Sequence, residues 1–160
     1  MRIATVAISA LAGLLLATPA FAVTVEAKTS TAFQEKLKDD IGVREEKILT
    51  ESLTKKVTRI FNERGIKAER VVVTIEDAKP NHPTWEQASS KPGLDPMRSV
   101  SVGGAHVTGI AYDASGKEIG RYDYDWYESD LSNVIPAATW SDAQTTFDRF
   151  ARRFAKELQG

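Results

Sequence analysis

The chain contains no cysteine among its 160 residues. Without thiols it can form no disulfide bond, no thiolate metal site and no lipid attachment through a cysteine. Its charge is nearly balanced as well, with 21 Lys and Arg against 22 Asp and Glu. That balance indicates neither a basic surface for nucleic acid nor a polybasic membrane patch. We therefore predict a protein that is held together by its apolar core and has no nucleic-acid partner.

Catalytic and cofactor motifs are also missing. The sequence has no G-x-S-x-G, H-E-x-x-H or phosphate-cradling glycine motif. Gly103 and Gly104 with Gly109 do not form a dinucleotide fingerprint, because no helix is expected after them. Serines are numerous, but none has a histidine at a motif spacing. The sequence therefore predicts no catalytic residue, no cofactor and no bound metal.

Residues 1–22 have the arrangement of a secretory signal peptide. A single positive charge at Arg2 precedes an apolar run, and small residues end at Ala20-Phe21-Ala22. A membrane anchor is the alternative, but the run is short for the ~20 residues that a spanning helix needs, and Pro19 lies near its end. We expect cleavage after Ala22. Residues 23–160 would then form a single periplasmic or secreted domain without membrane insertion.

Two long amphipathic helices are predicted. Between residues 44 and 64, apolar side chains recur every three or four positions, and Gly65 is suited to a left-handed C-cap. The second helix begins at Ser141, which forms a capping-box pattern with Gln144. Its wide apolar stripe consists of Ala143, Phe147, Phe150, Ala151, Phe154, Ala155 and Leu158.

Strands account for most of the remaining regular structure. β-branched residues between positions 70 and 77 predict a central strand, and residues 23–28 a short edge strand. Residues 99–113 and 118–127 form a hairpin through a three-residue loop that contains Gly116. Residues 29–42 are expected to be a loop with one helical turn. The fold class is therefore α+β, with a mostly antiparallel sheet of about four strands and two long helices packed on one face.

The segment from 78 to 98 differs from its surroundings because it contains four prolines. They exclude a regular strand or helix there, and long loops of this kind are usually functional or disordered. Trp85 can either stack on a ligand or pin the loop to the domain, and large aromatic side chains more often pack than project. His82 is expected to be a solvated loop histidine. We predict that Trp85 and His82 belong to a binding surface.

The stretch RYDYDWYESD, residues 121–130, alternates charged and aromatic side chains. If Asp113 pairs with Lys117, the hairpin directs Tyr122, Tyr124 and Trp126 toward the helices and exposes Arg121, Asp123 and Asp125. His106 then falls on the aromatic face, away from the acids. No metal site forms in this register, although a shift of one residue would bring His106 to the acids. Arg121, Asp123 and Asp125 are predicted as a second part of the binding surface.

Several stretches carry a family resemblance: V-T-I-E-D-A-K-P, V-G-G-A-H-V-T-G and the closing W-x-D-A…F-D-R-F-A-R-R-F-A-K-E-L. They resemble uncharacterised secreted proteobacterial families and, more distantly, the small α+β modules of the Tol and curli-secretion systems. The resemblance implies a periplasmic setting and assembly with another envelope protein. It assigns no functional residue, and the missing cysteine departs from the lipoprotein members of those groups.

The sequence thus favours a non-catalytic periplasmic binding or interaction module of the cell envelope. One alternative is a hydrolase of an envelope polymer that uses Asp123 and Asp125 as acid and base or as metal ligands. A second alternative is a carbohydrate-binding domain, which would need at least two exposed coplanar rings among Trp85, Tyr127 and Trp140. The ligand and the oligomeric state do not follow from the sequence.

Overall fold

The computed structural model describes residues 23–134 and 138–160, so the predicted signal peptide lies outside the described residues. The described residues form a sheet of four strands: β1 (Thr24–Thr29), β2 (Arg70–Lys79), β3 (Gly104–Tyr112) and β4 (Glu118–Tyr127). The strands lie in the sheet in the same order as along the chain. β1 pairs parallel to β2, and the other two pairings are antiparallel. The predicted α+β fold with a mostly antiparallel sheet is confirmed, with one parallel pair at the β1 edge.

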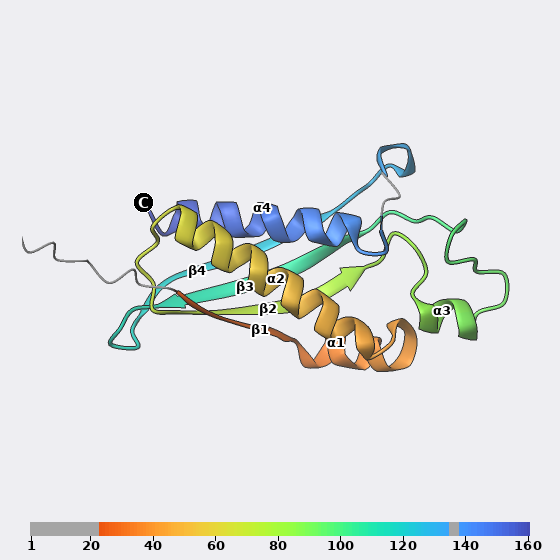
Figure 1. Ribbon diagram of the computed structural model, residues 1–160, viewed down its shortest axis with the longest axis horizontal. Helices are drawn as coiled ribbons and strands as arrows, with labels where there is room; N and C mark the ends of the chain where they lie inside the picture. Colours follow the sequence, from red (N-terminus) through yellow and green to blue (C-terminus); the bar gives the residue numbers. More distant parts are fainter. Residues whose placement is uncertain (1–22, 135–137) are drawn as a thin grey trace, which may run out of the picture.

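The two long helices, α2 (Arg44–Glu63) and α4 (Ser141–Glu157), lie side by side over one face of the sheet (Figure 1). α2 is the crossover that a parallel β1 and β2 require. The predicted apolar stripe of α2 is buried throughout, and Gly65 ends this helix with a φ of 61°. Phe61 of α2 packs edge-on against Phe154 of α4 with ring centroids 5.5 Å apart. The other face of the sheet carries no helix among the described residues.

The segment after β1 is more helical than the sequence suggested. α1 (Thr31–Lys36) continues directly into η1 (Leu37–Ile41), a π-helical turn. Phe33, Leu37 and Ile41 are buried, and their spacing of four residues makes a short apolar stripe. The amide of Gly42 donates to the carbonyl of Leu37 at 2.7 Å, and the φ of 106° at Gly42 ends the turn.

The predicted capping box of α4 is wrong. No side chain caps this helix, because the Ser141 hydroxyl bonds to the backbone of Ala138 instead. Trp140 is buried at 3% exposure, and its indole N–H donates to Glu45 at 2.6 Å. Trp140 therefore has a structural role, joining the start of α4 to the first turn of α2.

The aromatic side chains of β4 face the helices as predicted. The ring centroid of Tyr122 lies 6.1 Å from those of both Phe150 and Phe154 on α4. Tyr122 also stacks on Tyr124 at 6.4 Å. The charged residues between them, such as Asp123, are exposed on the open face of the sheet.

The predicted pairing of β3 with β4 is wrong by one residue along most of the hairpin. The turn closes as expected, with the amide of Asp113 donating to Lys117 at 2.9 Å. The register then shifts next to Tyr112, because Ile119 is an extra residue in β4. The β-bulge offsets the pairing of the two strands by one residue, so the side chains of β3 lie on the faces opposite to those predicted, while β4 keeps its predicted faces. His106 consequently lies on the open face opposite Asp125.

Within the described ranges, none of the helices is both long enough and apolar enough to cross a bilayer.

Candidate functional site

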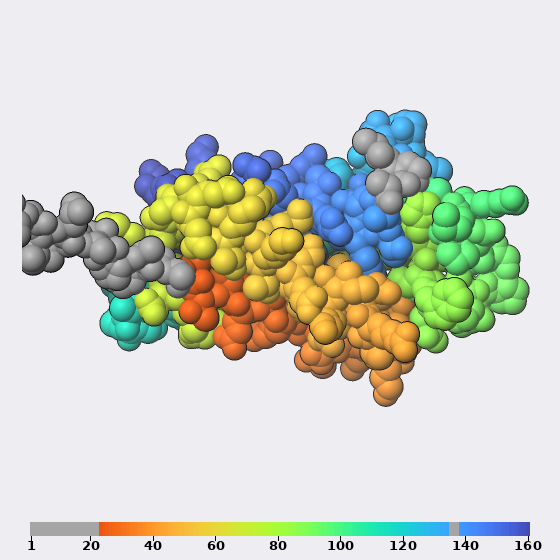
Figure 2. Space-filling model, in the orientation of Figure 1, coloured from red at the N-terminus to blue at the C-terminus, as the bar shows by residue number. Residues whose placement is uncertain are grey.

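A projecting loop, residues 80–103, connects β2 to β3 and forms one end of the molecule (Figures 1 and 2). The sequence predicted a proline-rich segment over residues 78–98. In the structure β2 extends to Lys79 and β3 starts only at Gly104, so the loop begins and ends later than predicted. The loop contains α3 (Trp85–Ser90), a helix that the sequence prediction excluded. α3 can form because it begins after Pro83 and ends before Pro92, so no proline interrupts its backbone hydrogen bonds.

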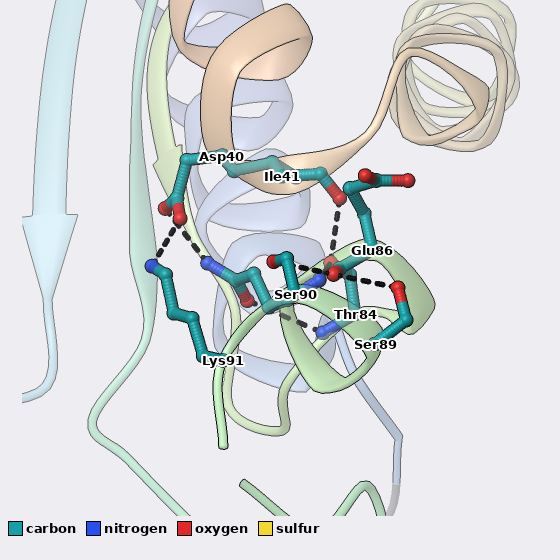
Figure 3. Close-up of polar contacts among 8 residues, drawn as sticks. Asp40, Ile41, Thr84, Glu86, Ser89, Ser90 and Lys91 are labelled. Atoms are coloured by element: carbon teal, nitrogen blue, oxygen red, sulfur yellow. Dashed lines mark hydrogen bonds and ion pairs between the residues drawn. The ribbon is translucent and has the colours of Figure 1, made fainter.

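Polar contacts from both ends of α3 attach this helix to η1 (Figure 3). Thr84 is the N-cap, and its hydroxyl accepts from the amide of Gln87 while donating to the carbonyl of Ile41 at 2.5 Å. The Gln87 side chain donates to Asp40 at 2.9 Å, and Lys91 forms an ion pair with Asp40. The hydrogen bond from Lys91 holds the pKa of Asp40 below its usual value. These contacts fix the orientation of α3.

Trp85 occupies the first position of α3 and points away from the domain, with 79% of its surface exposed. The expectation that this ring pins the loop is therefore wrong. Met97, at 84% exposure, is a second unpacked apolar side chain of the projecting loop. Leu94 and Val100 of the same loop are 37% and 36% exposed. The loop thus presents large apolar side chains to solvent from an anchored backbone.

The base of the projecting loop is held by a buried polar pair that sequence reasoning missed. Asn81 is fully buried, and its side-chain amide donates to a carboxylate oxygen of Asp142 at 2.6 Å. The same oxygen accepts from the amide of Gly103 at 3.0 Å. In return the amide of Asp142 donates to the side-chain oxygen of Asn81 at 2.8 Å. Both ends of the loop are thereby bonded to the first turn of α4.

A groove of about 350 Å³ lies between η1 and the projecting loop. Its lining is mixed, and it consists of Lys36, Asp40, Ile41, Lys79, Pro80, Pro83, Gln87, Leu94, Ser99, Val100 and Ser101. Lys36 forms an ion pair with Asp77 at 2.8 Å. The groove is within the size range of small-ligand sites.

The predicted site residues fall into two separate groups. His82 is half-buried in the projecting loop, where its Nδ1 lies 3.0 Å from the carbonyl of Ser99. The other group lies on the open face of β4, where Arg121 pairs with Glu118 at 3.1 Å and Asp123 with His106 at 3.0 Å. No hydrogen bond or ion pair between described residues joins the loop group to the β4 group.

The geometry gives little support to the two alternative functions. Asp123 and Asp125 are exposed on the open sheet face, and the side chain of Asp123 is 67% exposed, whereas a general acid and base normally work in a cleft. In the described part of the chain, no group of three or more His, Cys, Asp or Glu is placed to hold a metal ion. Trp140 is buried and Tyr127 is half-buried, so Trp85 is left without the second exposed ring that a sugar platform requires.

The environment of the Tyr127 hydroxyl predicts that the free energy of unfolding depends on pH in the alkaline range. Burial and the neighbouring Asp77 carboxylate, 3.2 Å from its hydroxyl, raise the pKa of Tyr127 above the usual value. The unfolded chain loses this proton near pH ~10, so the folded state loses stability as the pH rises above that value, by less than about 1.4 kcal/mol per pH unit. Urea unfolding between pH 8 and 11.5 should show a shallower alkaline decline for Tyr127→Phe. Parallel declines for the two proteins would contradict this assignment.

No family model matches this chain, and no curated protein matches it either. Among solved structures, one similar chain is described as "a putative lipoprotein from Caulobacter crescentus CB15". The two share 19% sequence identity and a TM-score of 0.31, over 69% of this chain and 77% of the other. A likeness at this level carries no argument about function. The family resemblance seen in the sequence stays a prediction.

Proposed function

We propose that this protein is a non-catalytic interaction module of the cell envelope, which binds another envelope protein through its projecting loop. The signal-peptide pattern of residues 1–22 supports the location. The exposure of Trp85 on the anchored helix α3 supports the contact surface. Arg121, Asp123 and Asp125 remain a predicted second contact area on the open face of the sheet.

The exposed tryptophan is the observation on which this proposal depends most. Tryptophan is enriched among residues that dominate binding energy at protein interfaces. Covering a large aromatic side chain removes on the order of 150 Å² of apolar surface from water, a gross gain of about 4 kcal/mol. Because α3 is already ordered by Thr84 and by contacts to Asp40, little further ordering is needed when a partner binds.

The proposal is tested by a photoreactive amino acid placed at position 85 of the protein in its native host. We expect a crosslink to one envelope protein, identified by mass spectrometry. The same amino acid at Lys67, an exposed residue between α2 and β2 at the other end of β2, is the control and should give no such product. The purified pair should then bind at least about tenfold more weakly when Trp85 is replaced by alanine.

Two results would contradict the proposal. The first is a partner that crosslinks equally from positions 85 and 67, because the contact would then not be specific to the loop. The second is an unchanged affinity of the purified pair with Trp85→Ala. A Met97→Ala variant, which removes another highly exposed apolar side chain of the loop, distinguishes a single anchor from a wider apolar contact.

A further inference from the structure

Two arginines of α4 lie over aromatic rings of the edge strand β4. The guanidinium carbon of Arg149 is 4.2 Å from the ring centroid of Trp126, and that of Arg153 is 4.8 Å from the ring centroid of Tyr124. Both pairs join the same helix to the same strand, and all four residues lie within regular secondary structure. The two guanidinium groups are therefore held in place by the rings beneath them.

Neither arginine has an acidic partner among the described residues. Arg59 and Arg152, which lie nearby on the same helical layer, both form ion pairs with Asp148, at 3.0 and 2.6 Å. The acids of β4 cannot take this role, because Asp123 and Asp125 point to the opposite face of the sheet. Arg149 and Arg153 are exposed and carry two positive charges that no carboxylate in the described ranges neutralises.

Stacking on a ring leaves the N–H donors of a guanidinium free, because those donors lie in the plane of the group. Residues four apart on a helix have their Cβ atoms about 6 Å apart, so the two groups can reach one anion together. A tetrahedral phosphate group offers oxygens to both arginines, whereas a carboxylate can be bound by the paired N–H donors of a single guanidinium group. The aromatic residues on β4 are also about 6.7 Å apart along the strand, which matches this spacing.

We propose that Arg149 and Arg153 form a binding site for a phosphate group, supported from below by Trp126 and Tyr124. The site lies on α4 and β4 and is separate from the projecting loop. Its ligand is a phosphate monoester or diester, whether on a soluble metabolite or on a lipid headgroup. Lysines in place of the arginines would keep the charge but lose the planar arrangement of N–H donors and much of the stacking on the rings.

The test is a titration of the purified protein with inorganic phosphate at constant ionic strength, followed by the NMR signals of the arginine side-chain Nε–Hε groups. We expect saturable shifts of Arg149 and Arg153 with a dissociation constant of about 1–10 mM. Arg149→Gln with Arg153→Gln should abolish saturation, and the double lysine variant should weaken binding by about fivefold or more. Arg152→Gln with Lys156→Gln removes the same charge from the same helix and should change the affinity by less than about twofold.

Equal weakening in the two double glutamine variants would overturn the proposal, because binding would then reflect the general charge of α4. An absence of saturable shifts with phosphate would also overturn it. Acetate at the same ionic strength should produce no saturation. Glycerol 3-phosphate and vesicles of phosphatidylglycerol in phosphatidylcholine distinguish the two sources: tighter binding to the vesicles indicates a lipid headgroup, and equal or tighter binding to the soluble ester indicates a metabolite.

Discussion

Replacing Asp142 with alanine is expected to lower the free energy of unfolding by about 3 kcal/mol. One oxygen of this buried carboxylate accepts hydrogen bonds from both Asn81 and Gly103. The variant leaves the buried amide of Gly103 without an acceptor, and the side-chain amide of Asn81 keeps only its bond to the carbonyl of Ser101. An unsatisfied buried polar group costs far more than an exposed one. Urea unfolding measures the loss. Hydrogen exchange at the amides of Ser101 and Gly103 should accelerate by more than exchange elsewhere in the sheet.

Asp148→Ala is the matched control for this variant. Asp148 lies on the same helix and also has two partners, Arg59 and Arg152, but these pairs are exposed. Exposed ion pairs contribute about 0–1 kcal/mol, so the loss should be correspondingly small. Asp142→Asn keeps an oxygen acceptor in place, so its loss in free energy of unfolding should lie between those of the two alanine variants. A loss for Asp142→Ala no larger than that for Asp148→Ala would show that the pair with Asn81 does not hold the loop.

Long, regular patterns in the sequence were sufficient to predict the framework. The helices over 44–63 and 141–157 each carry an apolar stripe of several turns, which has few alternative interpretations. α3 was missed because its flanking prolines outweighed its own signal. That signal was present as Thr84-x-x-Gln87, a capping-box pattern that the structure uses. A helix of six residues is too short to give a periodic pattern.

The polar pair of Asn81 and Asp142 had no comparable signal. The two residues are 61 positions apart, and their contact exists only because the ends of the projecting loop lie against the first turn of α4. The exposure of Trp85 was equally unpredictable, because a tryptophan in a loop satisfies the same local pattern whether it packs or projects. The segment that holds the candidate binding surface could thus be predicted from the sequence. Whether its side chains face the domain or the solvent could not.

The hairpin register shows how one residue can overturn a local prediction. The turn chemistry around Gly116 was predicted correctly, but Ile119 bulges out of the strand and exchanges the faces of β3. The positions of the small side chains in β3 indicate which face of this strand lies against the helices. Ala105, Gly109 and Ala111 leave room for rings from β4 and α4, whereas His106 and Thr108 do not. Volume complementarity across the layers, more than the turn, fixes the register.

Gly109→Ala is therefore expected to lower the free energy of unfolding by about 2–3 kcal/mol, although it adds a single methyl group. A Cβ atom at this position would lie 2.7 Å from the ring of Phe150 and 2.8 Å from that of Phe154. Both rings are fully buried, so neither can move without disturbing the packing between α2, α4 and the sheet. Chemical denaturation of the variant measures the effect.

A double-mutant cycle with Phe150→Leu identifies the cause of that loss. If overpacking against Phe150 is responsible, the smaller side chain makes space for the new methyl group. The double variant should then be more stable than the sum of the single effects predicts, by about 1 kcal/mol or more. Additive effects would mean that Gly109 is required for its backbone and not for the space above it. The position of the helical layer over the hairpin would then need another explanation.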